Sequence, residues 1–147
     1  MDDFRSRNPK ITSFWNRLEC KIEECANQNR MFVIELPSGR RLKYTVVGKF
    51  NTLLARLGYT GERESFWGGK LMENVIQATA RDVLAESILR LEAAGIPVIF
   101  SAHDEVVCEV GEDFNGAQVK RLMTIAPDWM KDLPLEAEYV ESKYYLK

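Results

Sequence analysis

The sequence lacks any long uninterrupted run of apolar residues. No run approaches the roughly 20 residues that a helix needs to cross a bilayer, and the first ten residues, MDDFRSRNPK, hold no apolar core of a signal peptide. Internal repeats, low-complexity tracts and linkers are missing too. With 46% apolar and 29% charged residues, the chain is expected to be a cytoplasmic protein with no membrane partner, folded as a single domain over residues 1–147.

Cysteine is scarce. The three cysteines, Cys20, Cys25 and Cys108, are odd in number and show no Cys-x-x-Cys spacing. This pattern supports neither a disulfide framework nor a structural zinc site. We expect three reduced thiols that are mostly buried.

A strong net charge is also lacking, since the sum is -2, so the chain as a whole does not attract nucleic acid. The charges are nevertheless unevenly distributed. Residues 98–147 hold ten acids and five bases, whereas residues 37–63 hold one acid, Glu62, and six bases: Arg40, Arg41, Lys43, Lys49, Arg56 and Arg63. Such asymmetry is typical of solvated faces, and it also suits a phosphate-handling enzyme with a basic face beside an acidic metal site.

The N-terminal half is expected to start with a helix and a hairpin. Asn8 and Pro9 suit the cap and first position of a helix that ends near residues 27–29, and its apolar residues share one face: Ile11, Phe14, Trp15, Leu18, Ile22 and Cys25. The extended runs MFVIEL and RLKYTVV flank Pro37-Ser38-Gly39 and predict a β-hairpin. Residues 48–64 show no clean period and are expected to form a loop with room for a short helix.

A long helix is predicted from about Ser65 to Gly95, which would act as its C-terminal cap before Pro97. Long polar side chains follow one another on one face of its first turns: Lys70, Asn74, Gln77 and Arg81. This row has two interpretations. It is either a solvent face or a set of donors for the acceptors of a DNA minor groove.

The segment Val98 to Val110 predicts a second hairpin, in which two buried apolar strands flank the polar turn Ala102-His103-Asp104-Glu105. Carboxylates at such a tip suit Mg²⁺, which prefers oxygen ligands, although a solvated acidic turn is the simpler interpretation. A weaker helix over residues 113–125 and a strand over residues 135–140 should follow. This order predicts an α+β fold, an antiparallel sheet with helices packed on one face.

Several motifs in order resemble the C-terminal polymerase region of family A DNA polymerases (DNA polymerase I-like), in particular the phage-type members. The similarity covers nearly the whole chain and rests on Phe4-Arg5, residues 8–11, Phe14-Trp15, residues 36–44, 67–82, 102–105 and 127–135. The resemblance implies a partial polymerase palm in which Asp104 is a catalytic, metal-binding aspartate and Glu105 is an accessory catalytic acid near the primer end.

The resemblance also implies contacts with primer-template DNA. His103 would touch the primer backbone, and Gln77 would read the minor groove, with Asn74, Lys70 and Arg81 as further DNA-binding residues. The family usually has an asparagine four residues before that glutamine, whereas this chain has Glu73 there and Asn74 one position later.

The implied reaction is nucleotidyl transfer with a dNTP and two Mg²⁺ ions. The second metal-binding aspartate, of motif A, and the fingers helix have no counterpart in this sequence, so an upstream polymerase fragment is expected to supply them. The chain alone should be inactive. Two other hypotheses stay open at this stage: a non-catalytic, self-associating or DNA-binding remnant of the palm fold, which would form a homo-oligomer, and a metal-dependent nuclease.

Overall fold

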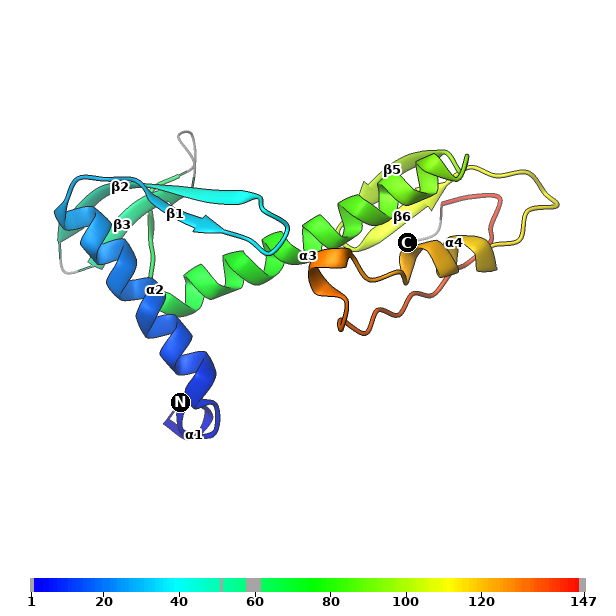
Figure 1. Cartoon of the computed structure of the whole chain (residues 1–147). Coiled ribbons are helices and arrows are strands. Elements are labelled where there is room, and N and C mark those ends of the chain that lie inside the picture. Colours follow the sequence, from blue (N-terminus) through cyan, green and yellow to red (C-terminus); the bar gives the residue numbers. More distant parts are fainter. Residues whose placement is uncertain (1, 51, 58–61, 146–147) are drawn as a thin grey trace. The chain divides into compact units, whose positions relative to one another are not determined.

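The backbone of the computed structural model, which describes residues 2–50, 52–57 and 62–145, separates into two compact units. The first unit is Met1–Thr79 and the second is Ala80–Lys147. Helix α3 (Gly68–Ala93) contributes residues to both (Figure 1). Among the described residues the strands form a four-stranded and a two-stranded antiparallel sheet rather than the single sheet we expected. The α+β class is confirmed, and the single domain stays a prediction.

The first unit begins with α1 (Asp2–Arg7), which the sequence did not predict, and α2 (Pro9–Asn27), which it did. Pro9 opens α2 as expected, but the Asn8 side chain does not cap it, because its Nδ2 donates to the Phe4 carbonyl oxygen at 2.9 Å. Cys20 is exposed, against our expectation of mostly buried thiols. Cys20 lies two positions after the buried Leu18, and two positions along a helix lead to the opposite face.

The predicted first hairpin is confirmed by β1 (Phe32–Glu35) and β2 (Arg41–Phe50), with Gly39 at a φ of 84° in the turn. The loop expected over residues 48–64 is wrong, because β2 continues and β3 (Thr52–Leu57) and β4 (Glu64–Ser65) extend the sheet. A register shift between Val46 and Gly48 breaks the period of two that marks a strand. Residues 51 and 58–61 of that expected loop lie outside the described residues.

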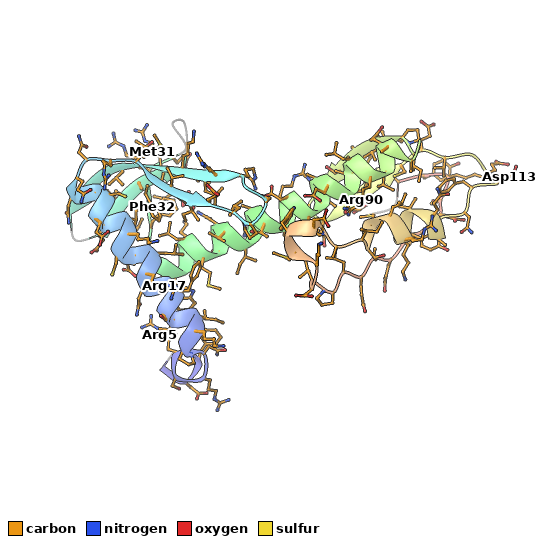
Figure 2. The ribbon with its side chains drawn as sticks, in the orientation of Figure 1. Arg5, Arg17, Met31, Phe32, Arg90 and Asp113 are labelled. Atoms are coloured by element: carbon orange, nitrogen blue, oxygen red, sulfur yellow. The ribbon has the colours of Figure 1, made fainter. Side chains whose placement is uncertain are left out.

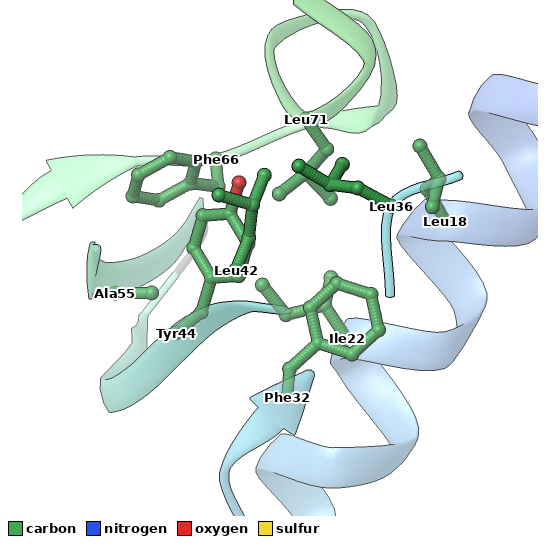
Figure 3. Close-up of a cluster of buried hydrophobic side chains, with 9 residues drawn as sticks. All are labelled: Leu18, Ile22, Phe32, Leu36, Leu42, Tyr44, Ala55, Phe66 and Leu71. Carbon is green, nitrogen blue, oxygen red and sulfur yellow. The ribbon is translucent and has the colours of Figure 1, made fainter. Parts of the chain in front are cut away.

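The first core lies between this sheet and helices α2 and α3 (Figure 3). Its buried side chains are Leu18, Ile22, Phe32, Leu36, Leu42, Tyr44, Ala55, Phe66 and Leu71. Tyr44 is fully buried and meets the Phe66 ring edge to face, with centroids 5.2 Å apart. Its hydroxyl accepts a hydrogen bond from Asn74 Nδ2 at 3.1 Å, so the one polar atom of this ring is satisfied.

In the second unit α3 ends as predicted. Gly95 has a φ of 75°, its N–H donates to the Glu92 carbonyl at 3.0 Å, and the N–H of buried Ile96 donates to the Leu91 carbonyl at 3.0 Å. These two bonds satisfy carbonyls that a helix end leaves free. Three elements follow: β5 (Val98–Ala102), β6 (Glu105–Cys108) and α4 (Ala117–Met123).

Arg90 connects α3 to the last turn of α4 and to the residues just beyond it. Arg90 Nε donates to the Leu122 carbonyl at 3.2 Å, and its Nη2 donates to the Ile125 carbonyl at 2.9 Å and to Ser87 Oγ at 2.8 Å (Figure 2). A short 3-10 helix, Asp128–Met130, comes next. The strand expected over residues 135–140 is wrong. Alternating polarity indicates which side faces inward, but a strand also needs a neighbouring strand for its hydrogen bonds.

We predict that Leu71→Ala lowers the free energy of unfolding by about 2–5 kcal/mol, because it leaves a cavity in the first core. Urea denaturation followed by circular dichroism measures the change. Ile76→Ala on the same helix is the matched control, since Ile76 is 55% exposed and should change stability by less than about 0.5 kcal/mol. Equal effects of both substitutions would contradict this packing.

Candidate functional site

The acidic tip of the second hairpin has the geometry of a two-residue turn. Ala102 pairs with Glu105, so only His103 and Asp104 connect the strands. His103 adopts a φ of 55°, the left-handed region that a β-hairpin turn of this length uses and that glycine usually occupies. His103, Asp104 and Glu105 are all exposed. The turn therefore presents two carboxylates and an imidazole to solvent, as the sequence predicted.

The two faces of this hairpin have different surroundings. Pairing alternates, so Ser101 and Val106 lie on one face, and Phe100 and Glu105 lie on the other. The first face meets α3, where Arg81 Nη1 donates to Ser101 Oγ at 3.4 Å. A register shift lies between Val98 and Phe100. Such a bulge changes the direction in which the neighbouring side chains of the strand point.

Helix α3 also affects the chemistry of Cys108 at the end of β6. Burial raises the pKa of the Cys108 thiol above its usual value, and the negative charge of Glu92 on α3 raises it further. Glu92 Oε1 in turn accepts a hydrogen bond from the backbone N–H of Val98 at 2.7 Å. The helix end and the base of the hairpin are therefore joined at this point.

The strands of this hairpin are less buried than we expected. Ile99 is 58% exposed and Phe100 is 40% exposed. The reason is that this sheet has two strands among the described residues, so the side chains of each strand have a neighbouring strand on one side only. Apolar side chains in that position remain accessible to a further strand or chain.

Tyr145 is the residue near the tip that sequence reasoning missed. Its ring meets Phe100 edge to face, with centroids 5.1 Å apart. Desolvation raises the pKa of Tyr145, and the negative charge of the nearby Glu105 carboxylate raises it further. No local spacing could have indicated a contact across forty positions of the chain.

The polar row on α3 has partners within the chain. Lys70 forms an ion pair with Glu64, and half-buried Asn74 bonds the Tyr44 hydroxyl as described above. Exposed Gln77 donates from Nε2 to Glu73 Oε1 at 3.1 Å. Lys70, Asn74 and Gln77 belong to the first unit, and Arg81 belongs to the second with the tip. Their contacts with DNA stay predictions.

The carboxylate groups at the tip are of the chemical type that binds a hard cation, because carboxylate oxygen is the ligand that Mg²⁺ prefers. They do not complete a metal site by themselves. Within residues 2–50, 52–57 and 62–145 no three His, Cys, Asp or Glu side chains are grouped to hold a metal ion. Nor is any described helix long and apolar enough to cross a membrane.

Comparison with curated proteins gives one informative relative. The chain is 33% identical over 172 residues to a protein named DNA polymerase from Bacillus phage SP02, a match that covers 98% of this chain and 26% of that protein. The chain is therefore related to a DNA polymerase and spans about a quarter of the relative's length. No family model matches the chain, and no solved structure matches it.

We predict that His103→Gly is about 1 kcal/mol more stable to unfolding than His103→Ala, because alanine in the left-handed region is strained and glycine is not. Both variants lack the imidazole, so their difference isolates the backbone of the turn. Urea denaturation of the two proteins measures it. Equal stability would show that the turn does not adopt this conformation in solution.

We predict that Cys108 reacts more slowly with iodoacetamide at pH 8 than an ordinary exposed thiol, because its raised pKa leaves less thiolate. Glu92→Gln keeps the acceptor for the Val98 N–H but removes the charge, so it should lower the pKa and speed the reaction. Pulsed alkylation across a pH series, read for the Cys108 peptide by mass spectrometry, measures both. The exposed Glu138→Gln serves as the control, and an unchanged rate in Glu92→Gln would refute the assignment.

Proposed function

We propose that this chain is the C-terminal palm part of a family A DNA-directed DNA polymerase, and that it contributes the hairpin tip to nucleotidyl transfer. One observation carries the proposal. A chain related to a DNA polymerase along 98% of its length presents Asp104 and Glu105 on the exposed tip of a two-residue β-turn.

Asp104 is the proposed magnesium ligand. A pair of Mg²⁺ ions, when bound, would stabilise the attacking and leaving oxygens of an in-line displacement on a dNTP. Asp104 is exposed, so its carboxylate is accessible to an ion from solvent. Glu105 is an accessory acid beside it, and His103, exposed on the same turn, is placed to touch the primer backbone.

The α3 row supplies the proposed contacts with primer-template DNA. Gln77 carries an exposed amide, which donates and accepts hydrogen bonds as minor-groove recognition requires. Its bond to Glu73 is an exposed side-chain contact that DNA can replace at little cost. Lys70, Asn74 and Arg81 are the further DNA-binding residues of the proposal.

The second metal-binding carboxylate and the fingers are assigned to another polymerase segment. Because the chain spans 26% of its relative, most of a polymerase of that length has no counterpart here. The proposed activity therefore depends on an upstream fragment, and the chain alone is expected to be inactive.

A second candidate function has one observation in its favour. The exposed side chains of Ile99 and Phe100 offer apolar area that a second copy of the chain can cover. The chain would then be a non-catalytic, self-associating remnant of the palm fold. Failure of the following experiment, together with a stable homo-oligomer in analytical ultracentrifugation, would favour this candidate.

The test is a chimera in which this chain replaces the matching segment of the Bacillus phage SP02 polymerase. We predict that the chimera extends a primer in the presence of Mg²⁺, and that Asp104→Asn reduces kcat by about 10²-fold or more, since charge stabilisation in the transition state is lost. Primer extension on a labelled template measures the rate.

Asp113→Asn is the matched control, because Asp113 is an exposed aspartate of the loop between β6 and α4 (Figure 2). It should leave kcat unchanged. A folded chimera that binds primer-template but extends no primer, or an Asp104→Asn variant with full activity, would refute the proposal.

A further inference from the structure

We propose that one face of helix α2 binds single-stranded DNA, through a row of cations with an aromatic ring between them. The row lies in the first unit, whereas the acidic tip lies in the second, so the row can bind DNA whether or not the tip is active. The further statement that this strand is the unpaired template ahead of a primer end rests on the proposed function.

Four side chains of α2 follow one another at spacings of four, three and four residues, so they share one face of the helix. They are Lys10, Phe14, Arg17 and Lys21. The three cations, which we call the α2 cationic row, are exposed and extend over about 16 Å along the helix axis. Successive phosphates of one DNA strand lie closer together than that, so the row can contact several of them at once.

The charges of the α2 cationic row are available to phosphate. Arg7, just before α2, forms an ion pair with Asp3 at 2.9 Å. No cation of the row forms an ion pair within the part of the chain that the structure describes. Residues 4–18 contain no acid, and the row ends where the acid Glu24 lies one turn beyond Lys21. An anionic strand can therefore bind here without breaking an ion pair.

Phe14 and Arg17 favour unpaired bases over a duplex. Phe14 is half-buried and packs against the first core, so its ring is held in place. The Arg17 guanidinium lies over this ring, with Cζ 5.6 Å from the centroid, and the Arg17 side chain is exposed (Figure 2). A planar guanidinium supported in this way can stack on a base. In a duplex the faces of the bases are covered by neighbouring pairs, so this contact selects single strands.

A hollow beside the row adds a neutral donor. It is lined by Pro9, Lys10, Ser13 and Arg17. Ser13 is exposed, and its hydroxyl can donate to a phosphate oxygen. The start of the row therefore combines two positive charges with a hydroxyl, the groups that commonly contact a DNA backbone.

The first test measures binding by the full chain without metal or primer. Fluorescence anisotropy with a labelled oligothymidylate of about 12 nucleotides gives the Kd over a series of salt concentrations. Each phosphate that a cation neutralises contributes about 0.7 to the slope of log Kd against log salt for a single strand. Lys10→Gln, Arg17→Gln and Lys21→Gln together should therefore lower that slope by about 2.

The matched control replaces three exposed lysines of the second unit: Lys120→Gln, Lys131→Gln and Lys143→Gln together. It changes the net charge by the same amount, so its slope should equal that of the unchanged chain. Equal slopes in the two triple variants would overturn the proposal, because binding would then follow net charge alone. Absence of binding by the unchanged chain would overturn it too. Circular dichroism verifies that both variants are folded.

Arg17→Lys separates stacking from charge. Lysine keeps the charge, so the salt slope should not change, but it lacks the plane that stacks on a base. The Kd for oligothymidylate should therefore rise about 3-fold. The Kd for an abasic strand and for a blunt duplex of the same length should stay the same. An equal loss with all three probes, or no loss with any, would overturn the assignment to single strands.

The second test uses the chimera described above. The triple substitution in the α2 cationic row should raise the KM for a primer-template with a long 5′ template overhang about 10-fold. It should leave kcat unchanged, as well as the KM for a primer-template with one unpaired nucleotide. An unchanged KM with the long overhang would overturn the template assignment. An inactive chimera counts against the proposed function alone, because binding of oligothymidylate is measured on the chain itself.

Discussion

Helix α3 is the constraint on which both units depend. Its first turn places Leu71 in the core of the four-stranded sheet, and its last turns bury Leu84 and Leu91 in the second unit. A two-stranded hairpin is marginally stable by itself in water. The hydrogen bonds that join α3 to β5, from Arg81 to Ser101 and from the Val98 N–H to Glu92, therefore help the second hairpin to hold its tip in a defined conformation.

The sequence predicted those elements whose signals are local. Gly39 and Gly95 both take the positive φ that a turn and a helix end require, and the apolar period of α2 matches its buried face. The acidic turn at residues 103 and 104 was predicted for the same reason, because polar residues between two apolar, β-branched runs leave few other arrangements.

Features that depend on distant partners were not predictable. The register shift near Val46 interrupts the alternating pattern, so the sequence did not show that β2 continues. Residues 135–140 alternate in polarity but pair with no other described strand. Tyr145 packs against Phe100, and nothing near Tyr145 in the sequence indicates that contact. Local patterns determine the shape of the turn, and long-range contacts determine what lies beside it.

The exposure of the tip separates folding from ion binding. A carboxylate in water needs no counter-charge, whereas a buried pair of carboxylates is strongly disfavoured. The second unit can therefore fold without an ion at Asp104, unlike a structural zinc domain, in which metal binding drives folding. In the proposed polymerase, repulsion between Asp104 and a second acid arises only on assembly, when a cation offsets it.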